Sequence, residues 1–298
     1  MSKKNSIKRL KNITLKTLKY VAIFLLLIIL ILSLPITQTT IGKYATDYVN
    51  ENFGTNIVVK KIDLSWLGSV NLKGIEIRDH HQDTLIFVDN LKTSLINVKK
   101  IVDNKVNLGE ASLSGVQFHL KTYKGEKDDN LAVFIDSFED GKPKDSLSTP
   151  FILKSELIRL EGLNFKLLDE NKDELLQFSA SNTSAELNDF SIIGPDVSMK
   201  IRNMQFTENR GVNISSLNTD FIYTKTHMQF DNTVLQTDND SRIDADIKLT
   251  YKREYLADFN DKVKIKAKFK KSDLAVKDLN KLYNELNGDD MIHFTGKV

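Results

Sequence analysis

Apolar and polar residues alternate along most of the chain after residue 56. Residues 197–201 read VSMKI, residues 243–251 read IDADIKLTY, and residues 263–269 read VKIKAKF. Successive side chains of a β-strand point to opposite faces, so a period of two places the apolar residues on one face and the polar residues on the other. The pattern therefore predicts many strands, each with one wet face and one apolar face.

Breaks rich in Asn, Asp and Gly separate these segments, at 79–83, 124–130, 169–173, 207–211 and 237–241. Short polar breaks between alternating segments are typical of hairpin turns, so the order predicts an antiparallel meander. A repeated β-α-β order and a glycine-rich phosphate loop are both missing from the sequence, which excludes a doubly wound fold. The predicted fold class is mainly β, an elongated, antiparallel, repeating β-groove with a few short helices.

Three short helices are predicted beside the strands. Residues 41–53 have apolar residues at helical spacing and precede Gly54. Two further helical patterns cover 131–138, with Asn130 as the cap, and 279–286, before Gly288. Helix 41–53 either packs on the first strands or lies on a membrane surface; packing is favoured because its polar face has no Lys/Arg cluster.

A seven-residue pattern recurs three times, as NLKGIEI at 71–77, SLSGVQF at 112–118 and RLEGLNF at 159–165. Its glycines are Gly74, Gly115 and Gly162. In each copy the Leu before the glycine and the apolar pair after it have opposite parity, a phase change that predicts a β-bulge or a sharp strand entry. Repeats of this length favour a sheet that grows by adding hairpin units.

The charge is distributed unevenly. The whole chain carries 42 basic and 40 acidic residues, a net charge of +2. The first twenty residues contain no acid and seven cations: Lys3, Lys4, Lys8, Arg9, Lys11, Lys16 and Lys19. Without them, 35 basic residues face 40 acidic ones, a charge of −5, so a basic nucleic-acid-binding body is excluded.

An uncharged apolar stretch, VAIFLLLIILILSL, follows at 21–34. It is too short to span the roughly 30 Å hydrocarbon core unless the helix begins at Leu15, with Lys16 and Lys19 reaching the headgroups. We therefore predict a cytoplasmic tail at 1–14, a transmembrane signal anchor at 15–35, and an exported body. A cleaved signal peptide stays open as the alternative.

The body is predicted to have two β-repeat regions, 36–138 and 151–298, joined by a polar link at 139–150 that reads EDGKPKDSLSTP. The absence of Cys excludes disulfides and thiol nucleophiles, and suits an oxidising compartment.

Residues that could perform catalysis or bind a metal are few. Asp79, His80, His81 and Asp83 share one turn, but neighbouring His side chains are expected to point apart, and the similar turn at 169–173 has no His. A solvated turn is therefore favoured over a metal site. Three further histidines have strand-like neighbours: His119, His227 and His293. We predict no catalytic residue, no metal, no cofactor and no enzymatic activity.

Several segments, in their order, resemble one family. They are LPITQTTIG (34–42), GTNIVVKKI (54–62), GSVNLKGIEIRD (68–79), DTLIFVDNL (83–91), ENRGVNI (208–214), SDLAV (272–276) and TGKV (295–298). Together with the basic tail and the apolar stretch, they are similar to the N-terminal part of the TamB family, the inner-membrane component of the translocation and assembly module, within the AsmA-like superfamily. The resemblance covers essentially the whole chain.

The resemblance implies a single-pass bacterial inner-membrane protein with a cytoplasmic N-terminus and a periplasmic β-groove. Such grooves are thought to carry phospholipid toward the outer membrane, and the family is tied to outer-membrane protein assembly and to protein secretion. Family members are longer, so we expect an N-terminal fragment. It lacks the C-terminal domain that meets an outer-membrane assembly protein of the TamA/BamA type.

A sheet with one apolar face must cover that face by packing, by closing on itself, or with a ligand. The alternating segments supply the candidates for a lipid-lining face: Ile243, Ile247, Leu249, Val263, Ile265 and Phe269. The alternative is a non-enzymatic periplasmic scaffold, in which the sheet is filled by its own side chains and recruits envelope assembly partners.

Overall fold

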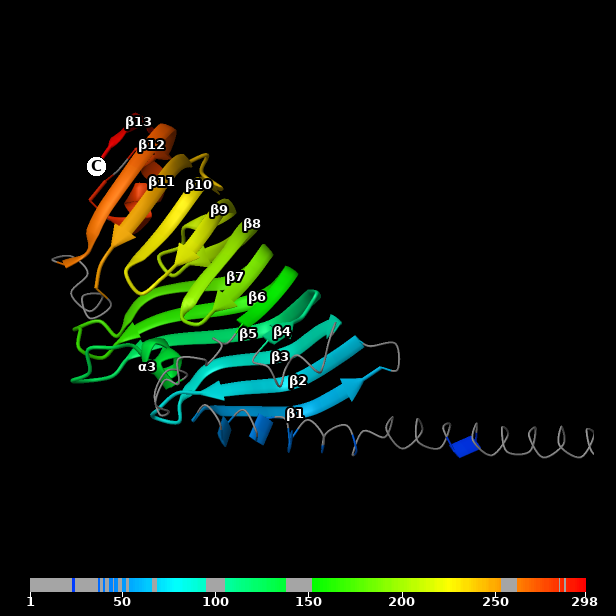
Figure 1. The fold of residues 1–298 in the computed structure, drawn as a ribbon. Coiled ribbons are helices and arrows are strands. Elements are labelled where there is room, and N and C mark those ends of the chain that lie inside the picture. Colours follow the sequence, from blue (N-terminus) through cyan, green and yellow to red (C-terminus); the bar gives the residue numbers. More distant parts are fainter. Residues whose placement is uncertain are drawn as a thin grey trace, which may run out of the picture.

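Thirteen strands form a single sheet in the computed structural model (Figure 1). The structure describes residues 54–65, 69–94, 105–137, 152–252 and 262–298, the last range without 284 and 287, and scattered positions from 23 to 51. The prediction of a mainly β chain is confirmed. Figure 1 shows the strands side by side in one twisting layer, from β1 at one edge to β13 at the other.

The strands are long in the middle of the sheet and shorter toward both edges. Their bounds are β1 Asn56–Leu64, β2 Ser69–Arg78, β3 Thr84–Ser94, β4 Lys105–Asn107, β5 Glu110–Thr122, β6 Ile152–Asp169, β7 Leu176–Ile193, β8 Asp196–Glu208, β9 Asn213–Tyr223, β10 His227–Thr237, β11 Arg242–Thr250, β12 Lys264–Ala275 and β13 Met291–Lys297.

Neighbours in the sheet follow chain order and are antiparallel, except where β6 pairs in parallel with β5 and with the short β4. The expectation of a wholly antiparallel meander is wrong at this parallel pairing, which we call the seam. A hairpin returns the chain in the opposite direction, whereas a long connection that contains a helix can bring it back parallel. The seam aligns Ser112 with Arg159 and Phe118 with Phe165, so the second and third copies of the repeat lie side by side.

Two helices interrupt the described strands, α3 at Asn130–Ser137 and α5 at Val276–Leu282. Asp129 caps α3, because its Oδ1 accepts the Ala132 N–H at 2.7 Å. The assignment of Asn130 as the cap is wrong: its side chain contacts Asp79 and the backbone of β5 instead. In the predicted helix 41–53, the described positions 43, 44, 46, 47, 50 and 51 are helical.

The three repeat glycines lie inside β2, β5 and β6 and have positive φ angles, 61° for Gly74, 61° for Gly115 and 68° for Gly162. At Gly162 the register of β6 with β7 shifts, as a bulge requires. At Gly74 and Gly115 the register is the same on both sides. The bulge prediction therefore holds for Gly162, and the other two glycines are left-handed kinks without an inserted residue.

Asparagines continue this feature across the sheet. Asn182 in β7, Asn203 in β8 and Asn232 in β10 have φ angles of 53°, 52° and 53°. Every ladder from β6–β7 to β12–β13 has a register shift. Bulges bend strands and increase their twist, so bulges in successive ladders bend the part of the sheet from β6 to β13.

The residues with left-handed backbone conformation also keep the apolar side chains of a strand on one side of the sheet. In β8, Met199 and Ile201 precede Asn203, and Met204 follows it with the opposite parity. All three apolar side chains nevertheless pack against the same buried cluster. The bulge at Asn203 shifts the alternation of side chains by one residue. The apolar residues after Asn203 change parity to match, so they stay on the same side of the sheet.

The buried core is small. Its central cluster consists of Ala111, Ile158, Ala185 and Leu187, on the three strands β5, β6 and β7. The two regions proposed for the body, 36–138 and 151–298, therefore share one sheet and one core. The link at 139–150 lies outside the described residues.

The predicted anchor at 15–35 also lies outside the described residues, apart from the helical positions Ile23 and Phe24, as do the seven N-terminal cations. Among the positions that the structure does describe, no helix combines the length and apolar character needed to cross a membrane.

Candidate functional site

The strand ladders align apolar side chains in rows that cross the sheet. Residues at paired positions of neighbouring strands point to the same face. One such row joins Val106, Leu153, Ile192, Val197, Tyr223, Met228, Leu249 and Ile265. The next row joins Met199, Phe221, Phe230, Ile247 and Ala267. Together these two rows define what we call the apolar face.

The opposite face is polar and charged. Its row between the two apolar rows contains Ser198, Ile222, Gln229, Lys248 and Lys266. Ion pairs lie on the same side, with Lys200 Nζ 2.7 Å from Asp189 Oδ2 and Arg202 Nη2 2.6 Å from Asp220 Oδ1. Water solvates this face, so the sheet has one side that favours solvent and one that does not.

The six residues predicted to line a groove lie on β11, on β12 and directly before β12. Ile243, Ile247 and Leu249 alternate along β11, and pairing brings Ile265 opposite Leu249 and Phe269 opposite Ala245. Val263 is buried just before β12 begins. Ile265 is 46% exposed, and the other apolar residues of β11 and β12 are half-buried or buried. The strands thus present a partly exposed apolar surface in this part of the sheet.

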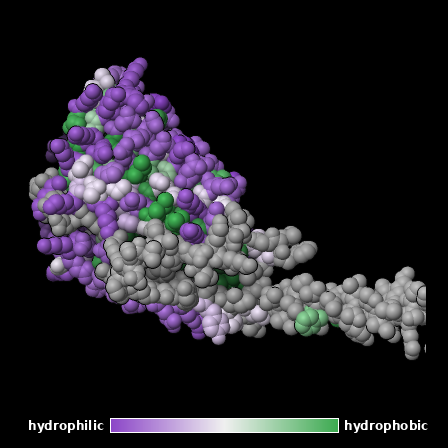
Figure 2. Space-filling model, viewed as in Figure 1, coloured by the Kyte–Doolittle hydropathy of each residue, from purple (hydrophilic) through white to green (hydrophobic). Residues whose placement is uncertain are grey.

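Besides the one sheet, the structure describes α3, α5 and helical positions between 23 and 51 and at 262, and the described strands form no second sheet that could cover it. Figure 2 shows hydrophobic residues gathered in patches along the middle of one view, with hydrophilic residues around them. Apolar surface left in water costs roughly 25 cal/mol per Å². A half-covered apolar face of this kind can accept hydrocarbon from another molecule.

A second cluster of functional side chains lies where three loops meet. The loops are the β2–β3 turn at 79–83, the segment at 123–129 after β5, and the β6–β7 turn at 170–175. The Tyr123 hydroxyl lies 2.7 Å from Asp79 Oδ2 and 2.9 Å from Asp83 Oδ2. Asn130 Nδ2 donates to Asp79 Oδ2 at 2.9 Å. The β2–β3 turn is therefore fixed by Tyr123, directly after β5, and by Asn130, at the start of α3.

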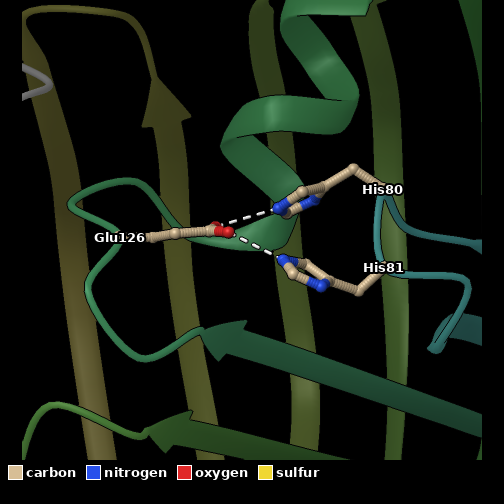
Figure 3. Close-up of side chains that lie close together, drawn as sticks. All are labelled: His80, His81 and Glu126. Carbon is tan, nitrogen blue, oxygen red and sulfur yellow. Dashed lines mark hydrogen bonds and ion pairs between the residues drawn. The ribbon is translucent and has the colours of Figure 1, made fainter.

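Two histidines of the β2–β3 turn face one carboxylate (Figure 3). His80 Nε2 lies 2.9 Å from Glu126 Oε2, and His81 Nε2 lies 2.7 Å from Glu126 Oε1. The expectation that neighbouring histidines point apart is wrong here. The three side chains are partly exposed, with 28% of His80, 45% of His81 and 33% of Glu126 accessible.

Charges and hydrogen bonds shift the proton affinities in this cluster. The hydrogen bond from His81, and then that from His80, holds the pKa of Glu126 below its ordinary value. Burial raises the pKa of Tyr123, and its hydrogen bonds to Asp79 and Asp83 raise it further. Tyr123 therefore remains a neutral hydrogen-bond donor at physiological pH.

The third loop joins through polar contacts. Asn171 Nδ2 donates to the carbonyls of Tyr123 and Glu126, at 3.2 and 3.1 Å, and its Oδ1 accepts the Gly125 N–H at 2.8 Å. Lys121 Nζ lies 2.9 Å from Glu170 Oε1 and 3.3 Å from Asp83 Oδ2. The polar turn at 169–173, which resembles 79–83 in sequence, thus holds the segment that carries Glu126.

No family model matches this chain, and no curated protein matches its sequence.

Ile247, Leu249 and Ile265, three of the six residues proposed from the sequence, lie in the two apolar rows. Glu126, Tyr123 and Asn130 were not predicted as partners of the turn at 79–83. These three residues follow that turn by 40 to 51 positions, and only the fold brings them back to it. The asparagine kinks were also missed. At Asn203 the signal is an apolar-x-Asn-apolar pattern with a parity change, the same pattern as around the three glycines, whereas Asn182 and Asn232 are each followed by Thr.

Proposed function

We propose that this chain is a lipid-carrying β-sheet whose apolar face holds the acyl chains of phospholipids. The observation that carries this proposal is the pair of continuous apolar rows, one crossing eight strands and the other crossing five, on one side of a single layer. A single apolar pocket would bind one ligand, whereas rows that cross many strands provide a path along which acyl chains can move.

The bulges in the ladders from β6–β7 to β12–β13 support the same function. Because bulges bend strands, the sheet is expected to curve around its apolar face and to form the groove in which the lipid lies. Headgroups would remain in water at the strand ends, and the charged opposite face keeps the sheet soluble. The groove itself is part of this proposal.

The resemblance to the TamB family suggests the direction of phospholipid transport and the cellular location of the chain. We propose that an N-terminal anchor holds the sheet at the bacterial inner membrane and that the body lies in the periplasm. Phospholipid would pass toward the outer membrane, and outer-membrane protein assembly and secretion would depend on that supply. The partner at the outer membrane would be an assembly protein of the TamA/BamA type.

Photo-crosslinking can test the proposal with two neighbouring positions. A photoreactive phenylalanine analogue replaces Ile247, on the apolar face, or Lys248, on the charged face. The full chain is produced in bacteria, irradiated, and analysed by mass spectrometry for attached phospholipid. We expect adducts at position 247 and far fewer at position 248.

Charge substitutions give the functional test. Ile247→Asp places a carboxylate between Phe230 and Ala267, whereas Lys248→Asp changes a solvated position. Lipid transfer between donor and acceptor vesicles should fall for Ile247→Asp and persist for Lys248→Asp. Equal labelling at both positions, with unchanged transfer by Ile247→Asp, would instead favour the scaffold that only recruits partners.

A further inference from the structure

The cluster of His80, His81 and Glu126 lies away from the apolar face and has a separate chemistry. One ring nitrogen of each histidine and a carboxylate oxygen of Glu126 all lie within 4.8 Å of one another. We propose that these three residues bind a divalent late first-row transition metal, with zinc as the reference ion, and that the metal ties the β2–β3 turn to the segment after β5.

The donor atoms fit such an ion. Zinc binds imidazole nitrogen and carboxylate oxygen at roughly 2.0–2.2 Å, in near-tetrahedral geometry, so its ligand atoms lie about 3.3 Å apart. The observed separations of 2.7 and 2.9 Å need to widen by about half an ångström, which the exposed side chains allow. Two imidazoles disfavour calcium and magnesium, which prefer oxygen ligands.

Metal binding replaces protons at this site. In hydrogen bonds to Glu126, each Nε2 carries a proton that it donates to a carboxylate oxygen. The ion requires the Nε2 lone pairs, so each ring keeps its proton on Nδ1, and any further proton passes to solvent. The carboxylate remains ionised and supplies a negative charge to the ion. Three protein ligands leave one position for water.

The ligands are also held in place by contacts with residues outside the proposed metal-binding set. The Tyr123 ring stacks against His81, with centroids 3.8 Å apart, and lies edge-on to His80 at 5.5 Å. Asp79 Oδ1 accepts the backbone N–H of His81 and of Asp83, at 2.9 and 3.0 Å. Preformed positions of this kind reduce the cost of ordering the ligands when the ion binds.

The zinc-binding test uses the untagged full chain in mild detergent. Zinc is titrated against a chromogenic chelator, and cobalt is used as a spectroscopic probe. We expect one equivalent of zinc, visible cobalt absorption of a four-coordinate site, and a higher melting temperature with zinc, because a ligand of the folded state stabilises it.

Two ligand variants and a control make the assignment specific. His81→Ala and Glu126→Gln should each weaken zinc binding by about 100-fold or more, and abolish the zinc-dependent shift in melting temperature. His293→Ala is the control, because His293 is also exposed and also pairs with a carboxylate, Asp273, at 2.6 Å. This control should bind zinc like the unaltered chain.

Three results would overturn the proposal: no stoichiometric zinc, unchanged affinity in both ligand variants, or equal loss in His293→Ala. Circular dichroism without metal checks that the variants fold. If His81→Ala fails to fold, Glu126→Gln decides, because glutamine keeps the size of the side chain and a hydrogen-bonding oxygen. A cluster that only joins the loops by hydrogen bonds would bind no zinc.

Discussion

Gly115 and Gly162 have nearly the same backbone conformation but different surroundings. A Cβ atom on Gly115 would lie 2.8 Å from the Cβ of Asp89, whereas nothing lies within 4 Å of a Cβ on Gly162. Alanine at either position incurs left-handed strain of about 1–2 kcal/mol. Gly115→Ala should cost about 1–3 kcal/mol more, because Asp89 must also move. Urea unfolding followed by circular dichroism checks this; equal losses would contradict it.

Asp278 is a buried carboxylate, 2% exposed, in the first turn of α5. Its oxygens accept hydrogen bonds from Thr237 at 2.5 Å, Ser241 at 2.6 Å and Asn239 at 2.6 Å. Asp278→Asn replaces one accepting oxygen with an NH₂ group, so we expect a loss of about 1–3 kcal/mol in the free energy of unfolding. The control Asp289→Asn, at an 84% exposed side chain, should change it little.

The effect of Asp278 should also depend on pH. Burial tends to raise its pKa, but the hydrogen bonds from Ser241, Thr237 and Asn239 together hold the pKa below its ordinary value. A lowered folded-state pKa stabilises the fold above the unfolded-state pKa, near 4, and this contribution disappears as the pH falls through the folded-state value. The stability difference between the unaltered chain and Asp278→Asn should therefore narrow below pH 4. A constant difference from pH 7 to pH 3 would contradict this cause.

At the scale of strands, the sequence pattern predicted the strands and their glycine kinks better than it predicted which way neighbouring strands pair. The alternation identified the strands of the described body, and the parity changes marked Gly74, Gly115 and Gly162 as backbone exceptions. The same parity change at Asn203 was overlooked, because asparagine is less diagnostic of a left-handed conformation than glycine. The parallel seam of β5 and β6 was not predicted either, since strand direction depends on where a long connection returns.

Asn203 tests whether these kinks depend on backbone conformation. Its φ angle is 52°, and its N–H donates to Asn218 Oδ1 at 3.0 Å. Asn203→Gly keeps this N–H and relieves strain, so stability should be unchanged or slightly higher. Asn203→Val also keeps the N–H, but a β-branched residue is disfavoured at positive φ, and we expect a loss of about 2 kcal/mol. Equal melting temperatures for the two variants would show that the kink does not need a left-handed residue.

At the scale of the molecule, the sheet is one layer with its largest described core cluster near one seam. Ala111, Ile158, Ala185 and Leu187 pack where β5, β6 and β7 meet. On β12, Ile265 of the apolar face is 46% exposed. The clustering of His80 and His81 with Glu126 also belongs to this scale, because it depends on how three loops meet. Sequence reasoning located the turns but not their meeting point, which is why Glu126 was not predicted.

Because Ile158 is buried in the core cluster and Ile265 is exposed, replacing each with alanine should cost different amounts of stability. Ile158→Ala, at a 6% exposed position, should cost about 2–4 kcal/mol and speed amide exchange in β5, β6 and β7. Ile265→Ala, at a 46% exposed position, should cost less than about 1 kcal/mol and affect only β11 and β12. Hydrogen exchange with mass spectrometry measures both. Strands in a layer contact only their neighbours, so stability is local; uniform loss of protection in either variant would mean that the sheet unfolds as one unit.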